Sequence, residues 1–291
     1  MKERLGVGKS HSKIILMGEH AVVYGYPAIA LPLTDINVTC QIKPAYQSVP
    51  QAENSLARAI TLAKDYLGKT ECQLRYELVS QVPEKRGMGS SAAVSLAGIR
   101  AVFDYFQEEL PDHVLSNLAN QAEKIAHSNP SGLDVKTCMS HQAIKFIKNQ
   151  GFEPLSIDLD AYLVIADTGI HGHTSEAVQK IADLGKKASP YLEQLGDLTL
   201  TAEKAIKAKE LEKLGHSMTK AHKQLAQLGV SCEVADYLVE KALAYGSLGA
   251  KMSGGGLGGC VIALIKNKTN AQKLSQYLKK EGACQTWIRN L

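Results

Sequence analysis

One stretch of the chain reads Val82-Pro-Glu-Lys-Arg-Gly-Met-Gly-Ser-Ser-Ala-Ala-Val-Ser-Leu-Ala97 and links a strand-like segment to a helix-like segment. Gly87 and Gly89 have no Cβ, so the backbone there can turn tightly and approach a ligand closely. Ser90 and Ser91 supply hydroxyls where a helix should begin. Backbone N–H groups and the positive end of a helix dipole therefore point into one loop, which predicts a phosphate site. The alternative is an ordinary capped helix start without a ligand.

Two other glycine-rich patterns are weaker candidates for nucleotide binding. Gly8-Lys9-Ser10 matches the end of a Walker A loop, but Glu3 stands where the first glycine belongs, and no strand fits before it. The letters Gly254-x-Gly256-x-x-Gly259 match a dinucleotide fingerprint, which requires a helix after the glycines. The run Cys260-Val-Ile-Ala-Leu-Ile indicates a buried strand there instead. Dinucleotide binding is therefore excluded at this loop, and a glycine hairpin is its simplest interpretation.

The composition is that of a globular protein with one large domain or two ordinary ones. Hydrophobic residues make up 45% and charged residues 21% of the 291 residues, which excludes a disordered chain. The net charge of +4 comes from basic residues interspersed with acidic ones, so nucleic-acid binding is not indicated.

Several features favour a soluble protein of the cytoplasm. The six cysteines are scattered without a C-x-x-C pair, as expected for reduced thiols. Lys9, His11 and Lys13 interrupt any N-terminal signal peptide, and no apolar run approaches the ~20 residues of a membrane span. We therefore expect no membrane partner.

The order of the predicted elements indicates a two-lobed α/β protein. Strands are expected at Lys13–Met17, Ala28–Leu31, Asn37–Ile42, Glu71–Val79, Ser140–Ile147, Tyr162–Ala166, Val261–Ile265 and Cys284–Ile288. Helices are expected at Glu53–Leu67, Ala92–Phe106, Asp112–His127 and Asn270–Glu281, and within Ser175–Ala244, with breaks near Pro190, Gly215 and Gly229. A boundary near Gly151–Asp160 predicts domains of residues 1–155 and 156–291.

A phosphate loop becomes an enzyme only with a metal ligand, a group that aligns the nucleophile and a positive charge. Glu123 is a candidate metal ligand on its predicted helix, although a solvent-facing glutamate is the ordinary interpretation. Asp134 ends the segment His127-Ser-Asn-Pro-Ser-Gly-Leu-Asp134, whose proline and glycine favour a fixed turn, and it is equally well a turn or cap residue. Lys13 opens a buried strand that ends at Gly18-Glu-His20; a solvated strand end is its alternative.

Three motifs together resemble the family of galactokinase, homoserine, mevalonate and phosphomevalonate kinases (GHMP kinases). They are Lys13-Ile-Ile-Leu-Met-Gly-Glu-His-Ala-Val-Val-Tyr-Gly-Tyr-Pro-Ala-Ile29, Pro83–Ala93 and Lys251-Met-Ser-Gly-Gly-Gly-Leu-Gly-Gly-Cys260. The motifs occur in the family's order and cover nearly the whole chain. Glu84, Lys85 and Arg86 depart from the pattern, because small residues are usual there.

The resemblance implies an α/β (α+β) fold. Its N-terminal domain would be like domain 2 of ribosomal protein S5 and its C-terminal domain ferredoxin-like, with the active site between them. Within the family, Gly18–Gly25 is most similar to the mevalonate kinase branch. The implied reaction is ATP-dependent phosphorylation of (R)-mevalonate on its 5-hydroxyl, in isoprenoid biosynthesis.

The resemblance also implies roles for individual residues. Asp134 would accept or steer the proton of the hydroxyl, and Lys13 would stand beside it. Ser91 and Glu123 would hold Mg²⁺, a hard cation that prefers oxygen ligands. The implied ATP-binding residues are Ser80, Lys85, Arg86, Gly87, Met88, Gly89, Ser90 and Ser91. The implied substrate-binding residues are Lys13, Glu19, His20 and Thr174.

Two alternatives remain open. Phosphomevalonate kinase would require additional cationic side chains, and Lys85 and Arg86 are the unexpected ones. A non-catalytic regulator on the same fold would have lost part of the set Lys13, Ser91, Glu123 and Asp134, all of which are present. The resemblance also leaves open a homodimer and inhibition by a downstream isoprenoid intermediate.

Overall fold

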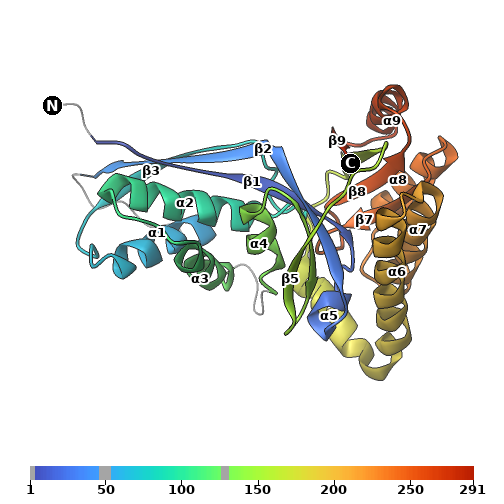
Figure 1. Ribbon diagram of the computed structural model, residues 1–291, viewed down its shortest axis with the longest axis horizontal. Helices are drawn as coiled ribbons and strands as arrows, with labels where there is room; N and C mark the ends of the chain where they lie inside the picture. Colours follow the sequence, from blue (N-terminus) through green and yellow to red (C-terminus); the bar gives the residue numbers. More distant parts are fainter. Residues whose placement is uncertain (1–3, 46–53, 126–130) are drawn as a thin grey trace. The chain divides into compact units, whose positions relative to one another are not determined.

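The chain forms two compact units in the computed structural model, which describes residues 4–45, 54–125 and 131–291 (Figure 1). The first unit takes its described residues from 1–13, 32–84 and 89–141, and the second from 14–31, 85–88 and 142–291. Because these units interleave along the chain, the predicted division into residues 1–155 and 156–291 stays a prediction. Both units mix helices and strands, which confirms the α+β class.

The first unit packs helices on one face of antiparallel strands (Figure 1). Its strands belong to β1 (Gly6–Met17), β2 (Ala28–Pro44) and β3 (Leu74–Ser80), and its helices are α1 (Ser55–Tyr66), α2 (Ser90–Phe106), α3 (Asp112–Glu123) and α4 (Leu133–Met139). The β2–β3 pairing runs from Val38 opposite Ser80 to Pro44 opposite Leu74. Helix α2 is almost wholly buried, because its small residues allow neighbouring elements to approach it.

Gly8 explains the false Walker pattern. Gly8-Lys9-Ser10 lies within strand β1, and a Cβ at Gly8 would overlap the backbone of α2 at Ala97. The glycine is therefore required for the close approach of strand and helix.

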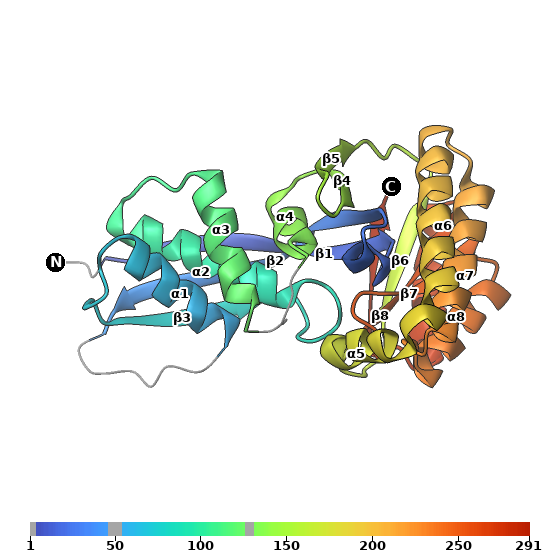
Figure 2. The same cartoon turned by 90° about the horizontal axis from the view of Figure 1, so that it is seen from below.

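The second unit is built on a four-stranded antiparallel sheet in the order β7-β8-β6-β9. Its strands are β6 (Tyr162–Asp167), β7 (Gly249–Ser253), β8 (Cys260–Ile265) and β9 (Gln285–Asn290). Its helices are α5 (Thr174–Leu184), α6 (Ser189–Lys207), α7 (Leu211–Gln227), α8 (Glu233–Ala244) and α9 (Lys268–Lys280), with the 3₁₀ helices η1 (Ala21–Tyr24) and η2 (Gly185–Ala188). Helices α7 and α8 contact β7 of this sheet, and α6 packs against α7 (Figure 2). The hairpin of β4 (Ala143–Ile147) and β5 (Gly151–Leu155) pairs with the first residues of β2.

Two predicted breaks are wrong, and both fall at residues that usually interrupt regular structure. Ala28–Leu31 and Asn37–Ile42 form one strand, β2, which continues through Pro32. Ala30 is the last β2 residue that pairs with β4, and Val38 is the first that pairs with β3. Pro32 lies between them, so neither β4 nor β3 requires the backbone N–H that proline lacks.

The other wrong break is at Gly215, which lies inside α7. A Cβ there would overlap the Leu248 carbonyl at the start of β7, so this glycine serves close packing. The chain between α6 and α7 turns at residues 208–210 instead.

Within the described ranges, four short elements were not predicted: η1, α4, β5 and β7. The β7–β8 pair is an antiparallel hairpin around Gly254–Gly259, which confirms the exclusion of a dinucleotide site. The predicted bounds at Glu53 and His127, with residues 128–130 of the turn before Asp134, lie outside the described residues. None of the helices in the described ranges has the length and apolar character needed to cross a membrane.

Substituting Gly215 by alanine tests the close packing of α7. Alanine favours an isolated helix by ~1 kcal/mol over glycine, but here its methyl group would collide with the Leu248 carbonyl. We expect Gly215→Ala to lower the free energy of unfolding by about 1–3 kcal/mol, as overpacking does. Urea unfolding measures this, with exposed Lys220→Ala on the same helix as the control, expected within ~0.5 kcal/mol of the parent. A Gly215→Ala variant as stable as its parent would contradict the packing argument.

Candidate active site

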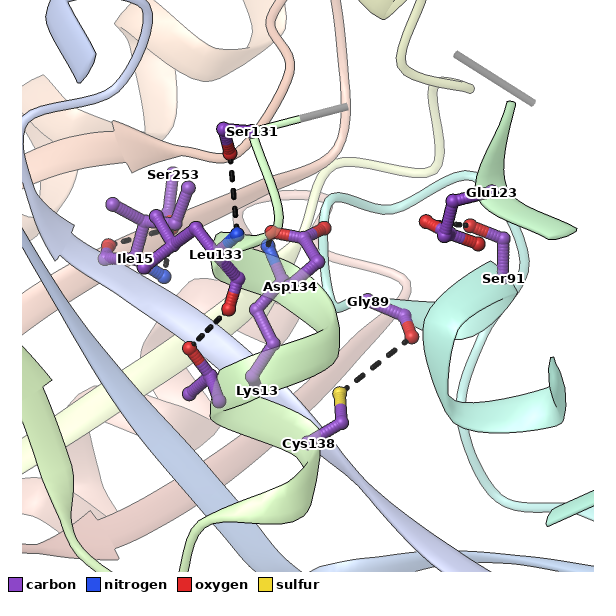
Figure 3. Close-up of polar contacts among 11 residues, drawn as sticks. Lys13, Ile15, Gly89, Ser91, Glu123, Ser131, Leu133, Asp134, Cys138 and Ser253 are labelled. Carbon is purple, nitrogen blue, oxygen red and sulfur yellow. Dashed lines mark hydrogen bonds and ion pairs between the residues drawn. The ribbon is translucent and has the colours of Figure 1, made fainter. Parts of the chain in front are cut away.

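Lys13 and Asp134 form a partly buried ion pair in the first unit. Lys13 lies on β1, and its Nζ is 2.8 Å from Asp134 Oδ1; their side chains are 2% and 32% exposed (Figure 3). Asp134 is in the first turn of α4, which begins after Gly132 at φ 81°. The Ser131 hydroxyl accepts a hydrogen bond from the Leu133 N–H at 3.3 Å. The turn thus presents a carboxylate to a buried ammonium group, although the two residues lie far apart in sequence.

Ser91 and Glu123 form a second polar pair in the same unit. The Ser91 hydroxyl at the start of α2 donates to Glu123 Oε2 at 3.0 Å (Figure 3). Glu123 is 1% exposed, so it is not the solvent-facing glutamate that its residue type suggests. Burial, and secondly the charge of Asp134, raises the pKa of Glu123 to about 7, while Ser91 and Lys13 act in the opposite direction.

These two oxygen groups fit a magnesium ion that also binds phosphate. Within the described ranges no three His, Cys, Asp or Glu side chains cluster as a metal site. Mg²⁺ usually takes only one or two protein carboxylates, and water and substrate phosphates complete its shell. Burial disfavours the charged form of a carboxyl group, and a bound divalent cation would stabilise that form. Ser91 and Glu123 therefore have the right donor chemistry.

Gly89 leaves space for the side chain of Lys13. Its φ is 71°, and a Cβ would lie 2.8 and 2.9 Å from carbons of the Lys13 side chain and 3.2 Å from Cys138 Sγ. The Cys138 thiol donates a long hydrogen bond to the Gly89 carbonyl at 3.9 Å (Figure 3). Burial raises the pKa of Cys138, so the thiol stays protonated. Sequence analysis missed Cys138, because a lone cysteine carries no signal.

The residues just before Gly89 belong to the second unit. The Lys85 carbonyl accepts a hydrogen bond from Gly172 N–H at 2.7 Å. A Cβ at Gly87 would lie 2.9 Å from the Ser253 carbonyl oxygen and 3.0 Å from Gly254 Cα. The first half of the predicted phosphate loop therefore packs on the glycine loop that follows β7. Met88 is fully buried.

Glu19 and Lys251 form a wholly buried ion pair in the second unit. Lys251 also donates to the Met252 carbonyl at 2.6 Å. Sequence analysis placed Lys251 in a motif but did not name it as a site residue. Its charge has a carboxylate partner, as a buried ammonium group requires.

His20 lies next to this pair in sequence and is also buried. Burial, and secondly the charge of Lys251, lowers the pKa of His20 to about 4, so the ring is neutral at physiological pH. Among the described residues, neither Glu19 Oε2 nor His20 Nε2 has a hydrogen-bond partner. Buried polar atoms left in this way are suited to a polar ligand.

The remaining predicted residues are less distinctive. The Ser80 hydroxyl at the end of β3 bonds to the backbone of Val82, at 3.1 Å to both N and O. Thr174 begins α5, and a Cβ at Gly255 would overlap its side chain, so it lies against the glycine loop. Lys85 is exposed, whereas Arg86 is 2.7 Å from Asp167 through its Nε. Contact of Ser80, Lys85, Arg86 or Thr174 with a ligand stays a prediction.

This chain is similar to known proteins along most of its length. The family described as GHMP kinases N terminal domain matches residues 54–142, and that described as GHMP kinases C terminal matches residues 202–284. A mevalonate kinase of Pyrococcus horikoshii is 31% identical, over 88% of this chain and 88% of its own length. The solved structure of mevalonate kinase from methicillin-resistant Staphylococcus aureus is 31% identical and superposes with a TM-score of 0.78, covering 99% of each chain.

A second solved structure, L. major mevalonate kinase in complex with R-mevalonate, is 25% identical and superposes with a TM-score of 0.83, covering 99% of this chain and 95% of that one. The sequence matches and the structural matches therefore point the same way. On this evidence the chain belongs to the GHMP kinase family.

Proposed function

We propose that the protein transfers the γ-phosphoryl group of ATP to the 5-hydroxyl of (R)-mevalonate. The observation that carries this proposal is the pair of Lys13 Nζ and Asp134 Oδ1, 2.8 Å apart. It supplies a proton acceptor and a fixed positive charge together, as transfer to an alcohol requires. The relatives named mevalonate kinase support the choice of substrate. Cytoplasmic location, a homodimer and inhibition by a downstream intermediate stay predictions.

Asp134 acts on the hydroxyl that attacks the phosphorus atom. Its carboxylate accepts the hydrogen of that hydroxyl and orients the oxygen, and it receives the proton as the new bond forms. The Lys13 ammonium pairs with Asp134 and stabilises negative charge on the reacting oxygen. Because Lys13 is buried, water screens this charge little.

The phosphates of ATP are held by backbone and metal. The N–H groups of Gly87, Met88, Gly89 and Ser90 are the proposed cradle, with the dipole of the 17-residue helix α2 behind them. Ser91 and Glu123 would hold Mg²⁺, which when bound neutralises charge on the phosphate oxygens.

Mevalonate recognition is assigned to Glu19, His20 and Thr174. Glu19 Oε2 can accept a hydrogen bond from a substrate hydroxyl. The neutral His20 ring can donate from one nitrogen and accept at the other. Both atoms are buried, so a ligand that failed to pair with them would leave polar groups unsatisfied. Such a site discriminates by hydrogen bonding.

The direct test is ADP release from Mg-ATP by the purified protein with mevalonate, phosphomevalonate, galactose and homoserine in parallel. We expect ADP with mevalonate alone. Release with phosphomevalonate instead would replace the proposal by the phosphomevalonate kinase alternative. ATP binding without release on any of the four substrates would favour the non-catalytic regulator.

Asp134→Asn tests the proton acceptor. The amide keeps the size of the side chain but not its basicity, so we expect kcat to fall by roughly 10²–10⁴ while the Kd for ATP changes little. Single-turnover kinetics and equilibrium ATP binding measure the two effects. The control is Asp158→Asn, which alters an exposed carboxylate paired with Lys209 and should leave kcat unchanged. Near-normal turnover by Asp134→Asn would rule out this role.

Glu123→Gln tests the metal ligand. Replacing a carboxylate by a neutral amide should raise the Mg²⁺ concentration for half-maximal activity by roughly 10–100-fold, the size of effect seen even for outer-shell groups. A magnesium titration at fixed, saturating ATP measures it, with the exposed Glu108→Gln variant as control. An unchanged magnesium requirement would remove Glu123 from the metal site.

A further inference from the structure

We propose that Arg86 and Asp167 form a latch that fixes residues 85–88, the first half of the phosphate loop, on the second unit before nucleotide binds. Arg86 is then a positioning residue that acts through Asp167. Its importance for ATP rests on the proposed kinase function, whereas its effect on the loop does not.

The side-chain contacts of Arg86 are directed at the end of β6. Its Nε lies 2.7 Å from Asp167 Oδ1, and its Nη2 donates to the Gly169 carbonyl at 3.1 Å. Asp167 Oδ1 also accepts the Gly169 N–H at 2.8 Å, which fixes the turn that carries this carbonyl. The two charged side chains are only 13% and 7% exposed. The guanidinium therefore makes one ion pair and one hydrogen bond with the turn after β6, while its buried Nη1 has no hydrogen-bond partner among the described residues.

The backbone of the loop is held at the same place. Besides the bond from Gly172 N–H to the Lys85 carbonyl, a Cβ at Gly259 would lie 3.1 Å from the Arg86 carbonyl oxygen. Gly259 N–H donates to Ile170 at 2.9 Å, and Thr168 N–H donates to Gly259 at 3.0 Å. Residues 85–88, the turn after β6 and the glycine loop after β7 thus pack together within the second unit.

Lys85 shows that this conformation is imposed from outside the loop. Its φ is 55°, a left-handed value that disfavours a residue with a Cβ. Such a conformation persists only where neighbouring contacts determine it. Two contacts supply this constraint: the hydrogen bond from Gly172 N–H to the carbonyl of Lys85 itself, and the ion pair of the next residue, Arg86, with Asp167.

A latched loop binds phosphate more tightly, because the loop is already ordered and loses less conformational entropy on binding. Breaking the latch should therefore weaken ATP binding more than it slows the chemical step. A phosphate-binding Arg86 would behave differently, since Asp167 would then have no part in ATP affinity. The two roles are separated by changing Asp167 instead of Arg86.

The first test is limited trypsin digestion of the full chain without substrates, with cleavage sites assigned by mass. Trypsin cuts after Lys85 and Arg86, and cutting requires the local backbone to open. Asp167→Asn retains an oxygen for the Gly169 N–H but removes the charge. We expect it to speed cleavage after Lys85 and Arg86 by about 10–100-fold, because the largely buried guanidinium loses its charged partner.

Two controls make this measurement specific. Cleavage after Lys69, in the exposed turn between α1 and β3, serves as the internal standard and should not change. Lys145→Met breaks an ion pair of similar burial, Lys145–Glu203 at 3.0 Å with 17% and 11% exposure, and should leave cleavage after Arg86 unchanged. Unchanged cleavage in Asp167→Asn, or an equal rise at every tryptic site, would overturn the latch.

The second test compares KM for ATP in Arg86→Met, Asp167→Asn and the double variant. The latch predicts a similar rise of about tenfold in each single variant, no further rise in the double, and a smaller change in kcat. A rise in Arg86→Met alone would make Arg86 a direct phosphate ligand and overturn the proposal. A parent protein without kinase activity would refute the proposed function, but the trypsin result would still decide the latch.

Discussion

A buried ammonium group needs a negative partner, and the first unit is organised around that requirement. Lys13 is almost inaccessible to water, and Asp134 lies 2.8 Å from its Nζ. Removing either charge would leave the other uncompensated at a site of low dielectric. The strand that carries Lys13 and the short helix that carries Asp134 must therefore keep their positions relative to each other. The same ion pair contains Asp134, the proposed proton acceptor.

The two carboxyl groups of this unit differ because their surroundings differ. Asp134 is paired with an ammonium group and is partly exposed, whereas Glu123 is deeply buried and accepts a hydrogen bond from the neutral hydroxyl of Ser91. Burial and the nearby Asp134 charge raise the pKa of Glu123 to about 7. One carboxylate is thereby suited to proton transfer, and the other to a cation that offsets its own burial.

Close approach of backbones is the second constraint on the structure. Gly8 lets β1 pack closely on α2, and Gly89 leaves space for the Lys13 side chain. Gly87 lets the phosphate loop pack closely on the glycine loop. In each case a Cβ would meet backbone or a packed side chain. Glycines that look like motif letters in the sequence are thus often places where two segments must touch. Gly215 misled prediction for the same reason, since a glycine that permits packing is read as one that ends a helix.

The chain alone determined the elements whose signals are local. The phosphate loop and the helix after it follow from glycines, hydroxyls and apolar periodicity over adjacent residues. The buried strand of Cys260–Ile265 follows from its unbroken apolar run. The three motifs carry the family resemblance, because each one is a short run of consecutive residues that can be read directly from the sequence. The start of α4 has a local signal in Gly132, although the helix itself was not predicted.

Only tertiary structure decided which distant side chains meet. Asp134 joins Lys13, Glu123 turns inward to Ser91, Lys251 neutralises Glu19, and Arg86 is paired with Asp167. None of these pairs is encoded by spacing, since each depends on how separate elements pack. The pKa values of Glu123 and His20 depend likewise on burial, which residue type does not specify. Local sequence therefore specifies which groups are available, and packing specifies their partners and their charge.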